Sequence, residues 1–129
     1  MTNTDHHVLA VDDNRINRIK MARALKDGYR VTQAEGGKEA LELLLTHSFD
    51  IVLLDIMMPD MDGFEVLRRM KDEVGLRDIP VIVVSGLEDT ESVSRCLAMG
   101  AVDFISKPFD LAQIKACVDS RLIAGSRHE

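Results

Sequence analysis

The sequence predicts an α/β protein in which helices cover both faces of a five-stranded parallel sheet. Short apolar runs alternate with longer segments whose apolar residues recur at helical spacing. Strict strand-then-helix alternation favours parallel pairing, because each helix carries the chain back across the sheet. The 129-residue chain is 46% hydrophobic and 29% charged, which is enough for one well-packed core beneath a charged surface.

Five strands are expected, at residues 8–11, 29–34, 51–54, 81–84 and 102–105. The first, third and fourth runs are apolar throughout, as in strands that are buried on both faces. The second and fifth contain polar residues, which is typical of the edges of a sheet. The order 2-1-3-4-5 places these two outside and is the flavodoxin-like arrangement, in which the site lies at the carboxyl ends of the first and third strands.

A helix is expected after each strand. The residues that define these helical patterns are Ile16, Ile19 and Leu25; Leu41, Leu44 and Leu45; Phe64, Leu67, Met70 and Val74; Val93, Cys96 and Leu97; and Leu111, Ile114 and Val118. Asp62, Asp89 and Asp110 are candidate N-caps, the first within an Asp-x-x-Glu capping box. Gly28 and Gly100 are expected to end helices.

One domain is expected at residues 7–124, between tails at 1–6 and 125–129. The 22 acidic against 16 basic residues give a formal net charge of -6, which argues against direct nucleic-acid binding. No apolar run approaches the roughly 18 residues of a membrane span, and residues 1–7 lack a signal pattern, so we expect a cytoplasmic protein without membrane contact. Cys96 and Cys117 lie in helical patterns and are interpreted as reduced core thiols.

Charged and hydroxyl side chains follow the carboxyl ends of the predicted strands. Asp12 and Asp13 follow the first strand, Asp55 the third, Ser85 the fourth and Lys107 the fifth. Three converging carboxylates repel one another, so they would share a proton or hold a cation. Oxygen ligands in a small, incomplete set suit Mg²⁺, which keeps waters and commonly bridges to a phosphate. The lysine and the serine could contact the same phosphate.

Four stretches at these positions resemble the response-regulator receiver domain, the CheY-like phosphoacceptor of two-component phosphorelay signalling. They are VDDN at 11–14, LLDIMMPDMDG at 53–63, VVSG at 83–86 and GAVDFISKPF at 100–109. Each stretch alone is a weak signal. Together, an acidic pair, a lone aspartate, a hydroxyl and a Lys-Pro pair, each beyond a different strand, make a strong one, and the resemblance covers nearly the whole chain.

The resemblance implies that Asp55 accepts a phosphoryl group from a phosphohistidine on a histidine kinase or histidine phosphotransferase. Mg²⁺ is the implied cofactor, held by Asp12, Asp13, Asp55 and the backbone carbonyl of Met57. Lys107 would pair with Asp55 and then with the phosphoryl oxygens. Metal, lysine and serine would act by positioning and electrostatics, and an ionised carboxylate needs no general base. The chain would catalyse only its own phosphorylation.

The resemblance also implies how the signal leaves the site. Ser85 would bond the phosphoryl group, and Phe104 would move inward as the switch aromatic. The fourth helix, fifth strand and fifth helix would form the output face, with a fused or separate output domain and a phosphorylation-linked dimer among the partners. The family pattern includes a cis bond in the Lys107-Pro108 pair.

Other function classes fit less of the pattern. A phosphatase with an aspartyl intermediate needs a second aspartate two residues after the nucleophile, where this chain has Met57. A flavodoxin-like electron carrier needs small residues around an anion after the first strand, but the turn is Asp12-Asp13-Asn14-Arg15. A pseudo-receiver, which acts as an interaction domain without phosphorylation, is the alternative, although such domains usually lose a site position and here all are present.

Two further expectations concern the loops beside the acidic cluster. Met57 and Leu87, each two residues beyond a site residue, are apolar where some relatives place polar groups near the hydrolytic water, so we expect slow intrinsic dephosphorylation. Asp60 and Asp62 follow Pro59 in a turn and are interpreted as loop and cap residues.

Overall fold

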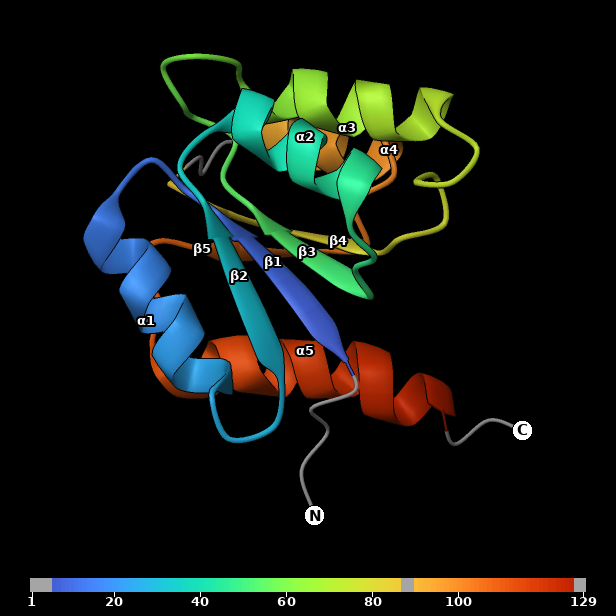
Figure 1. Ribbon diagram of the computed structural model, residues 1–129. Helices are drawn as coiled ribbons and strands as arrows, with labels where there is room; N and C mark the ends of the chain where they lie inside the picture. The colour runs from blue at the N-terminus through green and yellow to red at the C-terminus, as the bar shows by residue number, and fades with distance from the viewer. Residues whose placement is uncertain (1–5, 87–89, 127–129) are drawn as a thin grey trace.

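The computed structural model describes residues 6–86 and 90–126, within which five strands alternate with five helices (Figure 1). The elements are β1 (His7–Val11), α1 (Arg15–Leu25), β2 (Arg30–Ala34), α2 (Gly37–Thr46), β3 (Ile51–Leu54), α3 (Gly63–Asp72), β4 (Val81–Ser85), α4 (Thr90–Ala98), β5 (Asp103–Ser106) and α5 (Leu111–Ser126). The strands agree with the predicted ones to within one residue at each end. Helix α5 extends two residues into the segment expected as a tail, whose residues 127–129 lie outside the described part.

All strand pairs are parallel, and their order is β2-β1-β3-β4-β5, so the predicted order is confirmed. The two strands of mixed polarity, β2 and β5, are the edge strands. An edge strand has a neighbouring strand on one side only, so it is less buried and can contain polar residues. Val11 at the end of β1 lies beside Ala34 of β2 and Leu54 of β3. The residues that follow β1 and β3 therefore emerge side by side.

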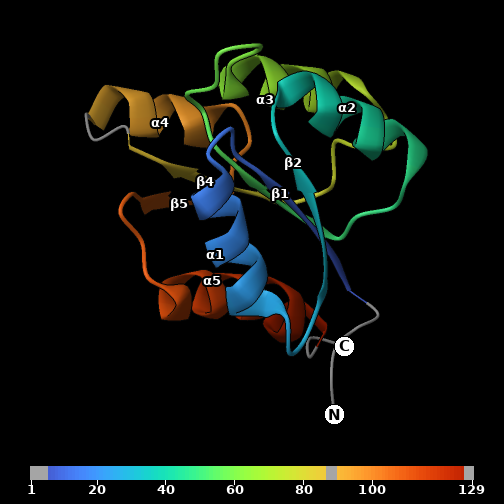
Figure 2. The same cartoon turned by 60° about the vertical axis from the view of Figure 1, so that its left-hand side comes forward.

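Helices α1 and α5 cover one face of the sheet, and α2, α3 and α4 cover the other (Figures 1 and 2). Alternate residues of each central strand point to opposite faces, so each face has its own core. In β1, Val8 and Ala10 pack toward α1 and α5, while Leu9 and Val11 pack toward α2, α3 and α4. The continuous apolar runs in the sequence follow from this two-sided burial.

The residue just before the first turn caps α1, α3 and α5 with its side chain. Asn14 caps α1 by accepting from the Asn17 amide at 3.0 Å, and Asp62 caps α3 by accepting from the Glu65 amide at 3.0 Å. Before α5, Asp110 and Gln113 bond each other's amides at 2.8 and 3.1 Å. The caps predicted at positions 62 and 110 are thereby confirmed, and the candidate at 89 lies outside the described residues.

Two glycines follow helices as expected. Gly100 adopts a φ of 110° after α4, a left-handed conformation that glycine accepts without steric cost. Its amide bonds the Leu97 carbonyl at 3.1 Å. The Gly28 amide bonds the Leu25 carbonyl at 3.1 Å at the end of α1.

The orientation of α1 corrects the helical pattern of the sequence. Ile16 and Ile19 are 64% and 37% exposed, whereas Arg18, Met21 and Leu25 are buried. Residues at spacings of three and four share one helix face, so burial of Met21 and Leu25 brings Arg18 beneath the helix as well. Helices α2 and α4 also leave apolar pattern residues in solvent, since Leu45 is 63% and Leu97 46% exposed. Val74, expected in the third helix, lies beyond the end of α3 and is 77% exposed.

No helix within residues 6–86 and 90–126 has the length and apolar content that crossing a membrane requires.

Candidate functional site

Asp12, Asp13 and Asp55 meet at the carboxyl edge of the sheet, with one carboxylate oxygen from each lying within 4.8 Å of the others. The backbone holds two of them firmly. The Asp12 amide bonds the Ala34 carbonyl at 3.1 Å, and the Asp55 amide bonds the Val11 carbonyl at 3.0 Å. The sheet's hydrogen bonding thus continues one residue beyond β1 and β3. Asp12 and Asp55 are buried, while Asp13 is exposed at the rim.

Lys107 reaches this cluster from the segment after β5. Its amide bonds the Ser85 carbonyl at 2.9 Å, and its peptide bond to Pro108 is cis. Its Nζ lies 2.8 Å from Asp12 Oδ2 and 3.2 Å from Asp55 Oδ2. The sequence resemblance implies the pairing with Asp55, whereas the shorter contact with Asp12 comes from the tertiary structure.

The charges are unbalanced, because one ammonium faces three carboxylates. Burial and then the Asp12 charge raise the pKa of Asp55, against the opposing effect of Lys107. Burial alone would lower the pKa of Lys107, but hydrogen bonding to Asp12 and the Asp55 charge outweigh it and raise the pKa. Lys107 is therefore a cation at neutral pH. The remaining negative charge and the all-oxygen donor set fit a hard divalent cation such as Mg²⁺.

Ser85 and Phe104 lie on the two strands next to the cluster. Ser85 is fully buried at the end of β4, in register with Ser106 of β5. Phe104 pairs in register with Val83 and packs, partly buried, against the core on the side of α2, α3 and α4. The described strands thus bring the predicted hydroxyl to the same sheet edge as the acidic cluster.

Met57 begins the loop that follows the Asp55 segment, and its side chain is 62% exposed. Its amide donates to Asp55 Oδ1 at 3.2 Å, so the loop turns back toward the carboxylate. Further along, the Gly63 amide bonds the Ile56 carbonyl at 2.7 Å and closes the loop. A side chain at position 63 would lie 2.6 Å from the Asp55 carbonyl oxygen, so glycine is needed for this close approach. Leu87 lies outside the described residues.

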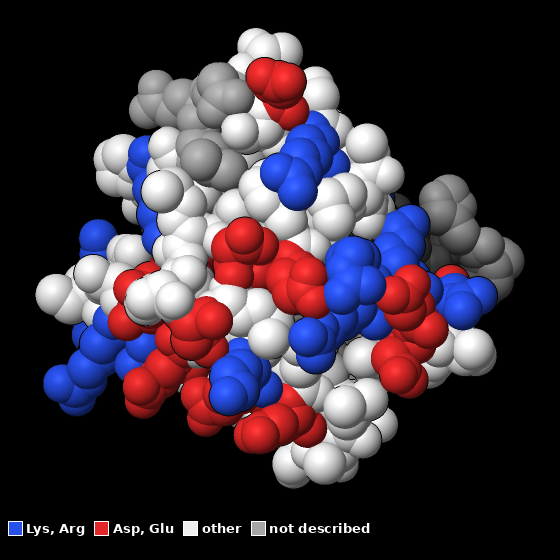
Figure 3. Space-filling view, turned by 90° about the horizontal axis from the view of Figure 1, so that it is seen from above, with Lys and Arg blue, Asp and Glu red and all other residues white. Residues whose placement is uncertain are grey.

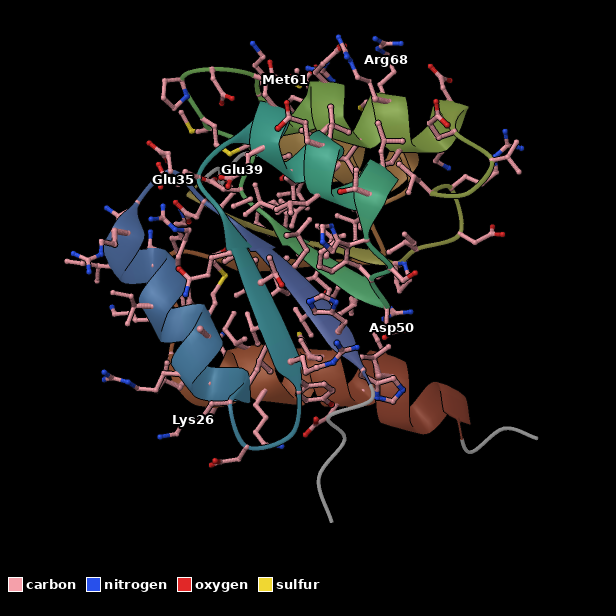
Figure 4. The ribbon with its side chains drawn as sticks, viewed as in Figure 1. Lys26, Glu35, Glu39, Asp50, Met61 and Arg68 are labelled. Atoms are coloured by element: carbon pink, nitrogen blue, oxygen red, sulfur yellow. The ribbon has the colours of Figure 1, made fainter. Side chains whose placement is uncertain are left out.

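Asp60, interpreted from the sequence as a loop residue, caps α2 from another part of the chain. Its two carboxylate oxygens accept hydrogen bonds from the amides of Gly37 and Lys38, each at 3.2 Å. Burial acts to raise the pKa of Asp60, but the Lys38 and Gly37 amides outweigh it and lower the pKa. Met61 lies close against Gly37, and Figure 4 shows it above the first turn of α2. The loop beside Asp55 is therefore tied to α2.

Arg18 is the residue beside the cluster that the sequence reasoning missed. It is only 8% exposed, and its Nη1 donates to the Asp12 carbonyl at 2.8 Å. The available signal was its spacing from Met21 and Leu25, which places it on the buried face of α1.

The chain matches the family model described as the response regulator receiver domain over residues 8–119. It is 41% identical over 118 residues to a probable transcriptional regulator of Cyanidium caldarium, covering 91% of this chain and 46% of that protein. It is 42% identical over 104 residues to a two-component response regulator of Oryza sativa subsp. indica, covering 79% of each chain. The chain thus spans about half the length of the first relative and most of the second.

Solved structures give the same result. A chemotaxis response regulator of Vibrio cholerae superposes with a TM-score of 0.85 at 30% identity, covering 91% of this chain and 98% of that one. The phosphorylated response regulator of a cyanobacterial phytochrome superposes with a TM-score of 0.82 at 25% identity, covering 92% and 95%.

Proposed function

The chain belongs to the response regulator receiver domain family of two-component signalling, and from this premise we propose that it is a switch phosphorylated on Asp55. The phosphoryl donor is the phosphohistidine of a histidine kinase or histidine phosphotransferase. The receiver domain occupies residues 7–124 and works in the cytoplasm, and it signals to a fused or separate output domain.

The observation that carries the proposal is the burial of Asp55 between Asp12 and Lys107. Asp55 is 3% exposed, and Lys107 Nζ lies 3.2 Å from its Oδ2. A carboxylate held on the sheet backbone is already a nucleophile when ionised, so its role needs orientation and charge balance rather than a base. Lys107 supplies a fixed cation beside the carboxylate that would accept the phosphoryl group.

Mg²⁺ would be held by four groups, namely the carboxylates of Asp12, Asp13 and Asp55 and the backbone carbonyl of Met57. The fit rests on the three clustered carboxylates and on the single ammonium that opposes them. Bound there, the ion supplies neutralising charge to the oxygens of the transferring group. Asp13 is the exposed member and would contribute its carboxylate from the rim of the cluster.

The response to phosphorylation follows β4 and β5. Ser85 donates its hydroxyl to the phosphoryl oxygens, and Phe104, the switch aromatic, moves inward. This changes the face formed by α4, β5 and α5, which we propose as the output surface and as the surface of a phosphorylation-linked dimer. A pseudo-receiver would need none of these positions, whereas this chain has each of them.

Intact-mass spectrometry after incubation with acetyl phosphate tests the proposal. The native chain, Asp55→Asn and the exposed control Asp27→Asn are compared with and without Mg²⁺. A single phosphoryl adduct that requires Mg²⁺, forms on the native chain and on Asp27→Asn, and fails on Asp55→Asn is the expected result. Absence of any adduct on the native chain would refute phosphorylation and favour the pseudo-receiver function.

A further inference from the structure

Arg18 stands apart among the buried polar residues of the described chain. These residues are Asp12, Arg18, Asp55 and Ser85, and all but Arg18 already have a part in the proposed function. Buried arginines are rare unless they are paired with an anion. The position of this guanidinium therefore calls for a specific role beside the acidic cluster.

The guanidinium bonds neutral acceptors rather than a carboxylate. Its Nη1 donates to the Asp12 backbone carbonyl at 2.8 Å, and its Nε donates to Gln33 Oε1 at 3.3 Å. None of the ion pairs found within residues 6–86 and 90–126 includes Arg18. The contact with Asp12 is thus to the main chain, at the peptide group that joins Asp12 to Asp13.

The neighbouring groups of Asp12 are fixed by other hydrogen bonds. The Asp12 amide is fixed by the Ala34 carbonyl at 3.1 Å, and Asp12 Oδ1 accepts from the Asn14 amide at 2.9 Å. Arg18 donates to the Asp12 carbonyl, which is the oxygen of the peptide group between Asp12 and Asp13. The plane of this peptide sets the direction in which the exposed side chain of Asp13 leaves the backbone.

We propose that Arg18 is a positioning residue, which locks the peptide between Asp12 and Asp13 so that both carboxylates are arranged to bind Mg²⁺. The proposal rests on the function proposed above. Groups that orient metal ligands commonly change metal affinity by about 10-fold or more when they are removed. Preorganisation through Arg18 therefore strengthens binding without direct contact with the ion.

The sign of the effect separates positioning from simple electrostatics. Arg18 is a cation close to the ion's site, so its charge alone repels Mg²⁺, and its removal would tighten binding. Loss of positioning acts in the opposite direction, because the Asp12 carbonyl loses its donor and the acidic pair loses its fixed geometry. A weaker affinity after removal of a positive charge is therefore the signature of positioning.

The test is a titration of Mg²⁺, followed by calorimetry and by amide chemical shifts, on the native chain, Arg18→Met, Arg18→Lys and Arg23→Met. Arg23 lies exposed on the same helix, so Arg23→Met removes the same charge without touching the acidic pair. We expect Arg18→Met to raise the Mg²⁺ Kd about 10-fold and Arg23→Met to leave it within about twofold. Arg18→Lys, which keeps the charge and one donor, should recover part of the loss.

An Arg18→Met protein that folds and binds Mg²⁺ as tightly as Arg23→Met, or more tightly, overturns the proposal. Should Arg18→Met fail to fold, Gln33→Ala decides instead, because Gln33 is exposed on edge strand β2 and holds the guanidinium from outside. A raised Kd for Gln33→Ala supports positioning, and an unchanged Kd overturns it. If the native chain does not bind Mg²⁺, the proposed metal site itself is refuted. If the native chain binds Mg²⁺ and substitution of Arg18 does not change the Kd, only the positioning role of Arg18 is refuted.

Discussion

Lys107 contacts Asp12 across two intervening strands, with 2.8 Å between Nζ and Oδ2. Lys107 follows edge strand β5, whereas Asp12 follows β1, so β3 and β4 lie between their starting points. The pair therefore ties the edge of the sheet to its centre at the acidic site. It also keeps the lysine anchored beside Asp55 independently of the protonation of Asp55.

Removal of the lysine should reveal how much it stabilises the acidic cluster. Lys107→Met leaves the two buried carboxylates of Asp12 and Asp55 without their cation. In the absence of divalent ions, we expect this substitution to lower the free energy of unfolding by about 3 kcal/mol. Urea denaturation measures this. Adding Asp12→Asn to Lys107→Met should restore part of the loss, because the repulsion with Asp55 is then gone; strictly additive effects of the two substitutions would contradict the coupling.

Asp55 should oppose folding when it is ionised and no metal is bound. Its pKa is raised above the ordinary 3.8, chiefly by burial and then by the Asp12 charge, so the folded state binds the proton more tightly than the unfolded state does. Stability is therefore lost as the pH rises through the raised value. At pH 7 without Mg²⁺ we expect Asp55→Asn to melt at a higher temperature than the native chain.

Two thermal comparisons test that expectation. The advantage of Asp55→Asn should shrink as the pH falls toward 4, where the native carboxyl also becomes neutral. Mg²⁺ should raise the melting temperature of the native chain more than that of the variant. Equal melting temperatures at pH 7 would show that the ionised carboxylate carries no cost in the folded protein.

Protonation of His7 should lower the free energy of unfolding in mild acid. His7 Nδ1 donates to the Ser48 carbonyl at 3.0 Å, and its Nε2 lies 2.6 Å from the Thr32 hydroxyl oxygen, a contact that the ring can make in either protonation state. Burial lowers the pKa of His7 below 6.5; the Ser48 carbonyl and Asp50 act against this, while Arg30 and His47 add to it. The amide of His7 also bonds Asp50, labelled in Figure 4 near the start of β1.

Because the unfolded chain takes up the proton at a higher pH than the folded chain does, stability should fall as the pH drops below about 6.5. His7→Gln cannot titrate, so its unfolding free energy should change less than that of the native chain between pH 7 and pH 5. Denaturation at a series of pH values measures the difference. Parallel pH profiles for the two proteins would exclude His7 as the titrating group.

The cap that Asp60 provides to α2 depends on the absence of a side chain at Gly36. A Cβ at Gly36 would lie 2.6 Å from Asp60 Oδ1, and the backbone there is extended, so alanine meets a steric conflict without backbone strain. Gly36→Ala should displace the carboxylate and cost about 1 kcal/mol, the typical value of a lost cap. Gly75→Ala is the matched control, since nothing lies within 4 Å of its Cβ position. Equal stabilities for the two variants would show that the cap contributes nothing.

Met57 should slow hydrolysis of the phosphorylated state. Met57 follows Asp55 by two residues, and its apolar side chain is exposed. Its backbone amide donates to the Asp55 carboxylate. An asparagine there could hydrogen-bond and orient a water, so we expect Met57→Asn to shorten the lifetime of the phosphoryl group. The decay of the adduct, followed by intact mass, measures it. Identical decay in the two proteins, on a scale of minutes or faster, would refute this role for Met57.

Charged side chains of both signs cover the surface seen over α2 and α3 (Figure 3). On α3, Glu65 pairs with Arg68 and Arg69 at 2.6 and 2.8 Å, so much of the basic charge on this helix is locally balanced. Helix α1 differs, because its charged residues are all basic. The net acidity of the chain therefore does not describe the surface beside the acidic cluster.

The fold class and the strand order follow from the pattern of apolar and polar residues along the chain. A strand that is buried on both faces is apolar throughout, whereas an edge strand can contain polar residues. The polar residues within 30–34 and 103–106 therefore identify the two edge strands. Parallel strands end at one edge, so residues that follow them, such as Asp12, Asp55 and Lys107, were expected to meet. The helix caps at Asp62 and Asp110 could also be predicted from the sequence, because a cap is a contact between residues that are only a few positions apart.

Other contacts depend on how whole helices and strands are rotated and packed, and the sequence pattern does not predict them. The burial of Arg18 in place of Ile16 follows from the rotation of α1 on the sheet, which its own apolar pattern leaves undetermined. The Asp60 cap on α2 joins residues 22 and 23 positions apart, and the contact of Lys107 with Asp12 spans most of the chain. Local sequence patterns encode where a helix begins and which faces are apolar, whereas long-range polar contacts are chosen when those faces pack together.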